Sequence, residues 1–143
     1  GLGTDRNLGN GRFVITFDDF SLNIPTEANY CINLSLHCPE SSDVLKKHLI
    51  NNQSDGFEPD SFTGYELIKR GGWISEPFNT YRKLDIYMFA EGSVFRHRAN
   101  KIFEMGVSHD VTPQIVSNIG NDRKVYRCGK SVFLPIKIKH NEI

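Results

Sequence analysis

The sequence lacks the runs and signals that define several protein classes. Its 143 residues contain three cysteines and one tryptophan, and the formal net charge is zero. No apolar run approaches the roughly 18 residues that a membrane-spanning helix needs, and no basic start followed by an apolar stretch suggests a signal peptide. We therefore expect a soluble chain without a transmembrane segment.

The cysteines are too few for a disulfide framework. Cys31, Cys38 and Cys128 cannot all pair, and Cys31 and Cys38 would face opposite ways on one strand because successive side chains alternate. A reducing, intracellular compartment is the simpler interpretation. The sequons at Asn33 and Asn52 leave a secretory origin open.

Motifs for catalysis and cofactor binding are missing as well. The sequence contains no Gly-x-Ser-x-Gly elbow, phosphate-cradling glycine loop or dinucleotide fingerprint. It has no paired Cys-x-x-Cys or His-x-x-x-His arrangement for zinc. A thiol hydrolase that uses Cys31 or Cys128 with a histidine is formally possible, but no spacing supports it. We expect no cofactor and no metal, and favour a non-catalytic function over an enzyme.

What the sequence does contain favours β structure. Ten Phe and five Tyr are many aromatic residues for this length, and aromatic residues favour strands. Short alternating segments recur between Gly, Pro and Asn turns. We predict a mainly β fold, an antiparallel β-sandwich or open barrel of about eight to ten short strands. Residues 1–11 form a flexible lead-in, and residues 12–143 form a single β-rich domain.

Residues 13–24 alternate in two phases. Apolar side chains stand at odd positions up to Phe17 and at even positions from Phe20, so the phase slips at Asp18-Asp19. One inserted residue in a strand has this effect. The pattern predicts a strand with a bulge or tight bend at the two aspartates.

Two further segments predict strands with distinct faces. In residues 29–38 the apolar face carries Ile32, Leu34, Leu36 and Cys38, and the opposite face carries Cys31, Asn33, Ser35 and His37. In the last strand, over residues 131–140, Phe133 shares a face with Lys137 and Lys139 that we expect to be exposed. Pro135 within this run predicts an edge strand or a break.

One segment has a helical period. Residues 42–50 follow a capping serine, carry Asp43 in the first turn, and place Lys46 and Lys47 towards the carboxyl end, which predicts one short helix. The alternative is an α+β fold in which residues 108–120 form a second helix.

Charge is distributed unevenly along the chain. Residues 1–91 hold 8 basic and 13 acidic side chains, a net charge of −5, whereas residues 92–143 hold 9 basic and 4 acidic ones, a net charge of +5. In the basic half, the candidate binding residues are Arg96, Arg98, Lys101, Lys137 and Lys139. Three interpretations remain open: lysines that protect an edge strand, a surface for an acidic protein such as a second copy, and a nucleic-acid site.

The acidic half contains a long loop with two aromatic residues. Exposed aromatic side chains on such a loop are often contact anchors, and the alternative is that they fold back over the core. The candidate binding residues here are Asp55, Phe57, Glu58, Asp60 and Phe62.

We therefore predict a β-rich interaction or assembly module that acts through charge-complementary contacts with a protein partner, including another copy of itself. A structural subunit of a virus or of a large complex would have this character. The alternative function is binding of an anionic polymer, RNA or DNA, by the basic half. RNA-binding signatures with interleaved Gly and aromatic residues are missing, which weighs against that alternative.

Overall fold

The computed structural model describes residues 13–49, 62–75, 78–118 and 124–139. Within them the chain forms eight short strands and two short helices. In chain order these are β1 (Tyr30–Asn33), α1 (Ser42–Leu49), β2 (Leu67–Arg70), β3 (Ile86–Phe89), β4 (Val94–Arg96), β5 (Phe103–Met105), β6 (Ser108–Asp110), α2 (Gln114–Asn118), β7 (Tyr126–Cys128) and β8 (Ser131–Ile136). The predicted lead-in, residues 1–11, lies outside the described residues.

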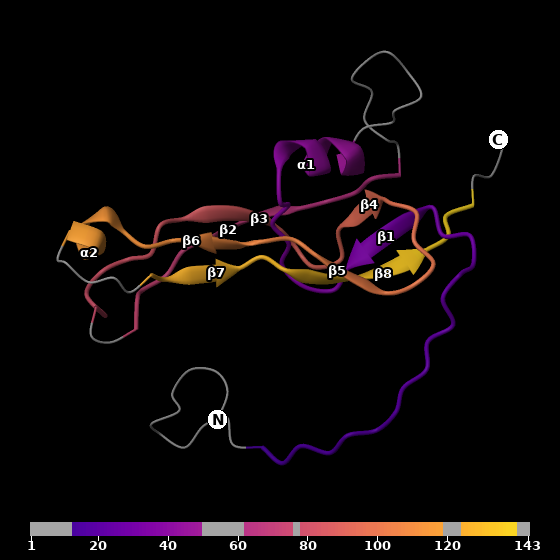
Figure 1. Cartoon of the computed structure of the whole chain (residues 1–143), viewed down its shortest axis with the longest axis horizontal. Helices are drawn as coiled ribbons and strands as arrows, with labels where there is room; N and C mark the ends of the chain where they lie inside the picture. The colour runs from indigo at the N-terminus through magenta and orange to yellow at the C-terminus, as the bar shows by residue number, and fades with distance from the viewer. Residues whose placement is uncertain (1–12, 50–61, 76–77, 119–123, 140–143) are drawn as a thin grey trace.

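All strand pairs are antiparallel, so the predicted mainly β, antiparallel class is confirmed. The strands form one four-stranded sheet of order β4-β1-β8-β5 and two two-stranded ribbons, β2-β3 and β6-β7. In Figure 1 the four-stranded sheet lies at one end of an elongated body, α1 lies beside it, and α2 lies beyond the β6-β7 ribbon at the other end.

Strand β1 occupies an interior position of the four-stranded sheet. It pairs with β4 on one side and with β8 on the other, so that Tyr30 lies opposite both Arg96 and Ile136. At its end, the Asn33 amide donates to the carbonyls of Ala90 (2.9 Å) and Ser35 (2.8 Å). These bonds hold the chain in a bend at residues 34–35, which is why β1 is shorter than the predicted strand over residues 29–38.

The core consists of side chains contributed by several strands. Cys31, Phe89, Phe95 and Phe133 form its buried centre, and Leu45 and Leu49 of α1 pack against them together with Phe103 and Met105. The ring centroids of Phe89 and Phe95 lie 5.0 Å apart, nearly perpendicular. Aromatic pairs in this geometry contribute about 0.5–1.5 kcal/mol beyond the burial of their surface.

His37 is a core residue. Its side chain is 1% exposed, and the imidazole lies edge-on to Phe133, with ring centroids 4.9 Å apart. Its backbone exchanges two hydrogen bonds with Phe89. Burial lowers the pKa of His37 below its ordinary value, while hydrogen bonding to the backbone of Gly129 and Met105 acts in the opposite direction. In the predicted strand over residues 29–38, the most deeply buried side chains therefore lie on the face that carries Cys31, Asn33 and His37. The polarity of these residues alone did not predict that this face is the buried one.

The helix predicted near residues 42–50 is confirmed as α1. The Ser41 hydroxyl accepts a hydrogen bond from the Val44 amide at 3.3 Å, and Asp43 lies in the first turn, where a carboxylate favours the positive end of the helix. The second helix of the α+β alternative reduces to the five residues of α2, Gln114–Asn118.

The predicted strand over residues 13–24 is wrong. No strand forms there, and apolar side chains that the alternation assigned to a sheet face are exposed to solvent. Figure 1 shows this segment leaving the body and running apart from it. Alternation gives a chain the two faces of a strand, but it does not supply the neighbouring strand that completes the backbone hydrogen bonds.

Two expectations for the last strand are also wrong. Phe133 does not share an exposed face with Lys137 and Lys139; it is fully buried in the core. Pro135 does not mark an edge strand, because β8 lies between β1 and β5. Strand β5 pairs only with Ser131–Phe133, so at Pro135 one side of β8 has no strand partner and the missing N–H costs no bond there.

The buried histidines predict acid sensitivity. Burial also lowers the pKa of His97. Both groups bind a proton more readily in the unfolded chain, so folding stability falls as the pH drops below their ordinary pKa of about 6.5. Urea denaturation between pH 7.5 and 5.5 should give a free energy of unfolding that falls by at most about 1.4 kcal/mol per pH unit and per histidine. His37→Leu should flatten this dependence; a wild-type stability that stays constant or rises towards pH 5.5 would contradict it.

Candidate functional site

The sheet brings together basic residues that lie far apart in the sequence. Arg96 ends β4 and lies opposite Tyr30, which itself lies opposite Ile136, the residue before Lys137. Neighbouring strands are about 4.8 Å apart, and β1 lies between β4 and β8. The two rows of basic residues, one at the end of β4 and one at the end of β8, therefore begin roughly 10 Å apart on either side of β1. We call this group the basic end; its members are Arg96, Arg98, Lys101, Lys137 and Lys139.

Asn29 fixes the chain beyond β8. Its side-chain amide donates to the Ile138 carbonyl at 3.0 Å, and its side-chain oxygen accepts from the Ile138 amide at 2.9 Å. The Asn29 backbone amide also donates to the Ile136 carbonyl at 3.2 Å. These bonds hold the backbone between Lys137 and Lys139 against the start of β1. The backbone that carries Lys137 and Lys139 is therefore fixed next to the start of β1.

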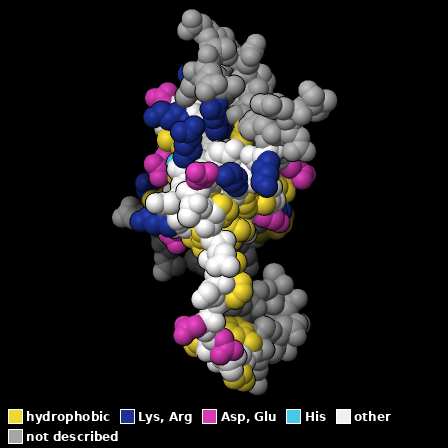
Figure 2. Space-filling view, turned by 90° about the vertical axis from the view of Figure 1, so that its right-hand side faces the viewer, with side chains coloured by type: hydrophobic (Ala, Val, Ile, Leu, Met, Phe, Trp, Pro, Cys, Tyr) yellow, Lys and Arg dark blue, Asp and Glu magenta, His cyan; other side chains and the backbone are white. Residues whose placement is uncertain are grey.

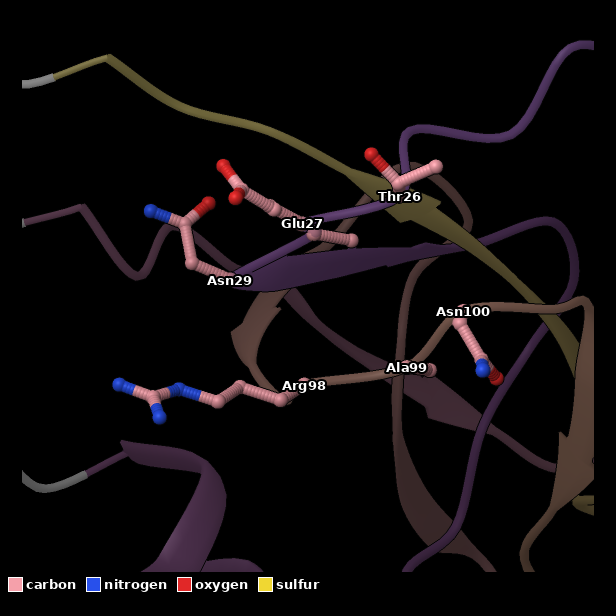
Figure 3. Close-up of a pocket in the computed structure, with 7 residues that line it drawn as sticks. Thr26, Glu27, Asn29, Arg98, Ala99 and Asn100 are labelled. Atoms are coloured by element: carbon pink, nitrogen blue, oxygen red, sulfur yellow. The ribbon is translucent and has the colours of Figure 1, made fainter.

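A hollow of about 610 Å³ opens beside these residues. Two segments line it, Thr26–Asn29 before β1 and Arg98–Asn100 after β4. Figure 3 shows the side chains of Asn29 and Arg98 extending in the same direction from these neighbouring segments. Apart from Ala28 and Ala99, every lining residue carries a polar or charged side chain, so the hollow suits a polar ligand rather than an apolar one.

One carboxylate lies among the basic residues. Glu27 accepts a hydrogen bond from the Lys137 ammonium at 2.6 Å, and this bond, together with the positive charge of Lys137, lowers the pKa of Glu27. Both side chains are largely exposed, so the pair contributes little to stability. It does set the position of the Lys137 ammonium at the rim of the hollow.

Lys and Arg side chains gather on this face of the molecule. Figure 2 views the end that carries β1, β4 and β8 and shows Lys and Arg side chains with acidic side chains among them. Arg98, Lys101, Lys137 and Lys139 are exposed, whereas Arg96 is half-buried. Of the five residues that the sequence singled out in the basic half, Arg96 ends β4, Arg98 and Lys101 lie in the connection from β4 to β5, and Lys137 and Lys139 follow β8.

Most of the acidic-loop candidates lie outside the described residues: Asp55, Phe57, Glu58 and Asp60. Phe62 is described. It is 37% exposed, and its ring centroid lies 6.0 Å from that of Tyr30 in β1. The ring of Phe62 therefore rests against the central strand, as the fold-back alternative expected, while part of it stays open to solvent.

The acidic and basic halves of the chain partly neutralise one another. Lys137 of the basic half pairs with Glu27 of the acidic half, at 2.6 Å. Asp110 and Lys124, which are both in the basic half, lie 3.5 Å apart. The charge split along the sequence is therefore only partly carried into space, and the excess of positive charge at the basic end is what remains of it.

Two of the three thiols are buried in the core, and Cys128 is exposed. Burial raises the pKa of the Cys31 thiol to about 12 and also raises that of Cys38, so neither supplies the thiolate that nucleophilic catalysis requires. All three cysteines are free. Among the described residues, no group of three or more His, Cys, Asp or Glu side chains could hold a metal ion.

Comparison with known families decides the wider identity. The family model for the CRISPR Csm4 C-terminal domain matches residues 26–136. The chain belongs to the CRISPR Csm4 C-terminal domain family. The match begins at the hollow and ends with β8, so it contains every strand of the fold. No curated protein is significantly similar to the chain.

Membership of the Csm4 C-terminal domain family assigns the chain to a subunit of a CRISPR complex. It agrees with the expected assembly module of a large complex, and it does not support the expected viral subunit. In the described ranges, neither helix is long and apolar enough to cross a membrane.

Sequence reasoning missed two residues at the basic end. Asn29 and Glu27 act on Ile138 and Lys137 across more than a hundred positions of sequence, and no local pattern announces such contacts. The sequence carried only a weak signal for these residues, the mostly polar segment Thr26–Asn29 at the start of the predicted strand over residues 29–38.

Removing the Asn29 side chain should loosen the basic end. Asn29→Ala deletes two hydrogen bonds to Ile138, at a cost of about 1–2 kcal/mol. The Ile138 amide should then exchange with solvent about tenfold faster or more, as measured by NMR hydrogen exchange. Asn100→Ala, at an exposed position on the other side of the hollow, serves as the control and should leave this rate unchanged. Equal rates in Asn29→Ala and the wild type would show that Asn29 does not hold this segment.

Proposed function

We propose that this domain is a non-catalytic assembly module of a CRISPR complex that binds the phosphate backbone of a single-stranded RNA with its basic end. The observation that supports the proposal is the register of β1, in which Arg96 of β4 and Ile136 of β8, the residue before Lys137, lie opposite Tyr30 on its two sides. Membership of the Csm4 family supports both an RNA-containing assembly and an intracellular location.

The chemistry of the basic end suits phosphates. Guanidinium groups bind phosphate oxygens with two parallel hydrogen bonds, and ammonium groups bind them as point charges. Two cationic rows about 10 Å apart would hold a flexible strand that runs across the start of β1. Contacts to phosphates carry no sequence information, so we expect binding with little sequence preference.

Glu27 would tune this surface. In the free domain its carboxylate forms an ion pair with the Lys137 ammonium. A phosphate that approaches Lys137 must therefore displace Glu27 or bind beside it. Because Glu27 competes with the phosphate for Lys137, RNA should bind more weakly and more reversibly than it would to five cations without a neighbouring carboxylate. Such binding suits a site that acts together with other subunits.

A second candidate is docking of an acidic protein surface on the same residues. The positive charge at the basic end favours it as it favours RNA, and a subunit of a complex has protein neighbours. Protein contacts lack the regular phosphate spacing and counterion release of a nucleic acid, so the dependence on salt separates the two candidates.

RNA binding should fall steeply with salt and depend on the two terminal lysines. Fluorescence anisotropy with a labelled oligouridylate should give a slope of log K against log salt of about −2 to −3.5, since each phosphate neutralised on a single strand contributes about −0.7. Lys137→Glu combined with Lys139→Glu should weaken binding about tenfold or more at low salt.

The matched control has the same change of charge elsewhere. Lys124→Glu combined with Lys130→Glu alters two exposed lysines that flank β7, Lys130 at the opposite end of β8 from Lys137, and should change the affinity by no more than about twofold. Equal losses in the two double variants would mean that only net charge matters. A salt-independent affinity, or no binding at all, would end the RNA proposal.

A further inference from the structure

Residues 13–24 form an extended apolar arm that stands in solvent. No hydrogen bond joins this segment to the described sheets. Figure 1 shows it leaving the body beside the four-stranded sheet. The exposed fractions of its large apolar side chains are Phe13 54%, Val14 93%, Ile15 57%, Phe17 88%, Phe20 81% and Leu22 46%. The arm precedes the matched range 26–136, so its role is separate from the function proposed above.

An arm of this kind has the properties of an unpaired strand. Its backbone donors and acceptors have no partners in the sheets, and its apolar side chains alternate. An extended segment gains main-chain hydrogen bonds and buries alternate side chains when it adds to an open sheet edge. Its only charged residues, Asp18 and Asp19, are acidic, so the matching edge should be apolar with a basic group next to the apolar positions.

Strand β2 offers such an edge. Within the described residues it pairs with β3 alone. One of its faces is open to solvent and carries Tyr65 (51% exposed), Leu67 (53%) and Lys69. An exposed edge strand with apolar side chains is a template for a further strand. From residue 65 to residue 69 the order on this face is apolar, apolar, basic.

We propose that the arm of one copy pairs antiparallel with β2 of a second copy, with Phe20 opposite Leu67. In that register Leu22 lies opposite Tyr65 and Asp18 lies opposite Lys69, so each apolar side chain meets an apolar one and the carboxylate meets an ammonium. Lys69 already pairs with Asp85 at 2.9 Å, and Asp18 joins this exposed pair.

The same register suits the other face of the two strands. Asp19 lies diagonal to Arg70, whose buried Nε atom has no hydrogen-bond partner among the described residues. Ser21 lies opposite Glu66, so no like charges lie directly opposite each other, and the diagonal neighbours of Asp19 are Arg70 and Glu66. Sliding the arm two residues towards Tyr65 would place Asp19 opposite Glu66, and sliding it two residues the other way would place Phe20 opposite Lys69.

Strand β7 is a second edge to which the arm of another copy could add, but it fits the arm less well than β2. It carries Tyr126 and Cys128 and is followed by Lys130, a comparable order, but Cys128 buries less apolar surface than Leu67. On its other face, Arg127 is engaged, since it donates to the Gly71 carbonyl at 2.7 Å. Each copy has one arm and one β2 edge, so mutual exchange closes a dimer and one-way pairing builds a longer chain.

Cysteine trapping tests the register directly. Two proteins are made on a Cys128→Ser background, one with Phe20→Cys and the other with Leu67→Cys, and are mixed under mild oxidation. Directly opposite residues have Cβ atoms about 4.5–5.5 Å apart, close enough for a disulfide after small adjustments. We expect a shift from monomer to a mixed, disulfide-linked dimer on a non-reducing gel. Ser21→Cys replaces Phe20→Cys as the control and should give no such dimer, because its side chain points to the other face.

Sedimentation velocity gives the second readout without any introduced thiol. The wild-type chain should sediment faster as its concentration rises, and Phe20→Ser combined with Leu22→Ser, at exposed positions, should remain a monomer. A wild-type chain that stays monomeric at every concentration would overturn the proposal, and so would a disulfide-linked dimer formed equally well by the Ser21→Cys control. A further variant carries both Phe20→Cys and Leu67→Cys in one chain; a disulfide that forms only within this chain, and not between two chains, would also overturn it.

Discussion

The antiparallel pairing of β1 with β4 on one side and β8 on the other is the constraint on which the rest of the structure depends. A strand at residue 30 is joined to residues near 96 and 136, so the sheet forms only when most of the chain is in place. The same pairing buries Cys31 among Phe95 and Phe133 and directs Arg98 and Lys137 to one end of the molecule. Core and candidate site thus arise from one set of backbone hydrogen bonds.

Local patterns predicted the parts of the fold that depend on local physics. The capping serine and the period of residues 42–50 are properties of a single turn of chain, and α1 forms where they indicate. The mainly β class followed from aromatic content and alternation. The faces of the strands did not follow, because burial is decided by the layer that covers a strand. Asn33 and His37 are interior because hydrogen bonds and aromatic rings from distant strands surround them.

The candidate site divides in the same way. Composition identified its basic residues, since an excess of Lys and Arg in residues 92–143 is visible without a structure. Their convergence was not predictable, nor were the roles of Asn29 and Glu27, because both depend on the register of β1 with β8. The apolar arm is the opposite case: its alternation predicted a strand, and no strand forms there, because no neighbouring strand pairs with its backbone in the described residues.

These two rows of basic residues should act as one surface for an anionic ligand. NMR titration of the 15N-labelled chain with a short oligouridylate at low salt tests it most directly, because backbone amides report position as well as affinity. Chemical-shift changes should concentrate in residues 26–30, 96–101 and 136–139 and should disappear as salt is added. Shifts that concentrate in β6, β7 and α2 instead, or that spread evenly over the chain, would contradict it.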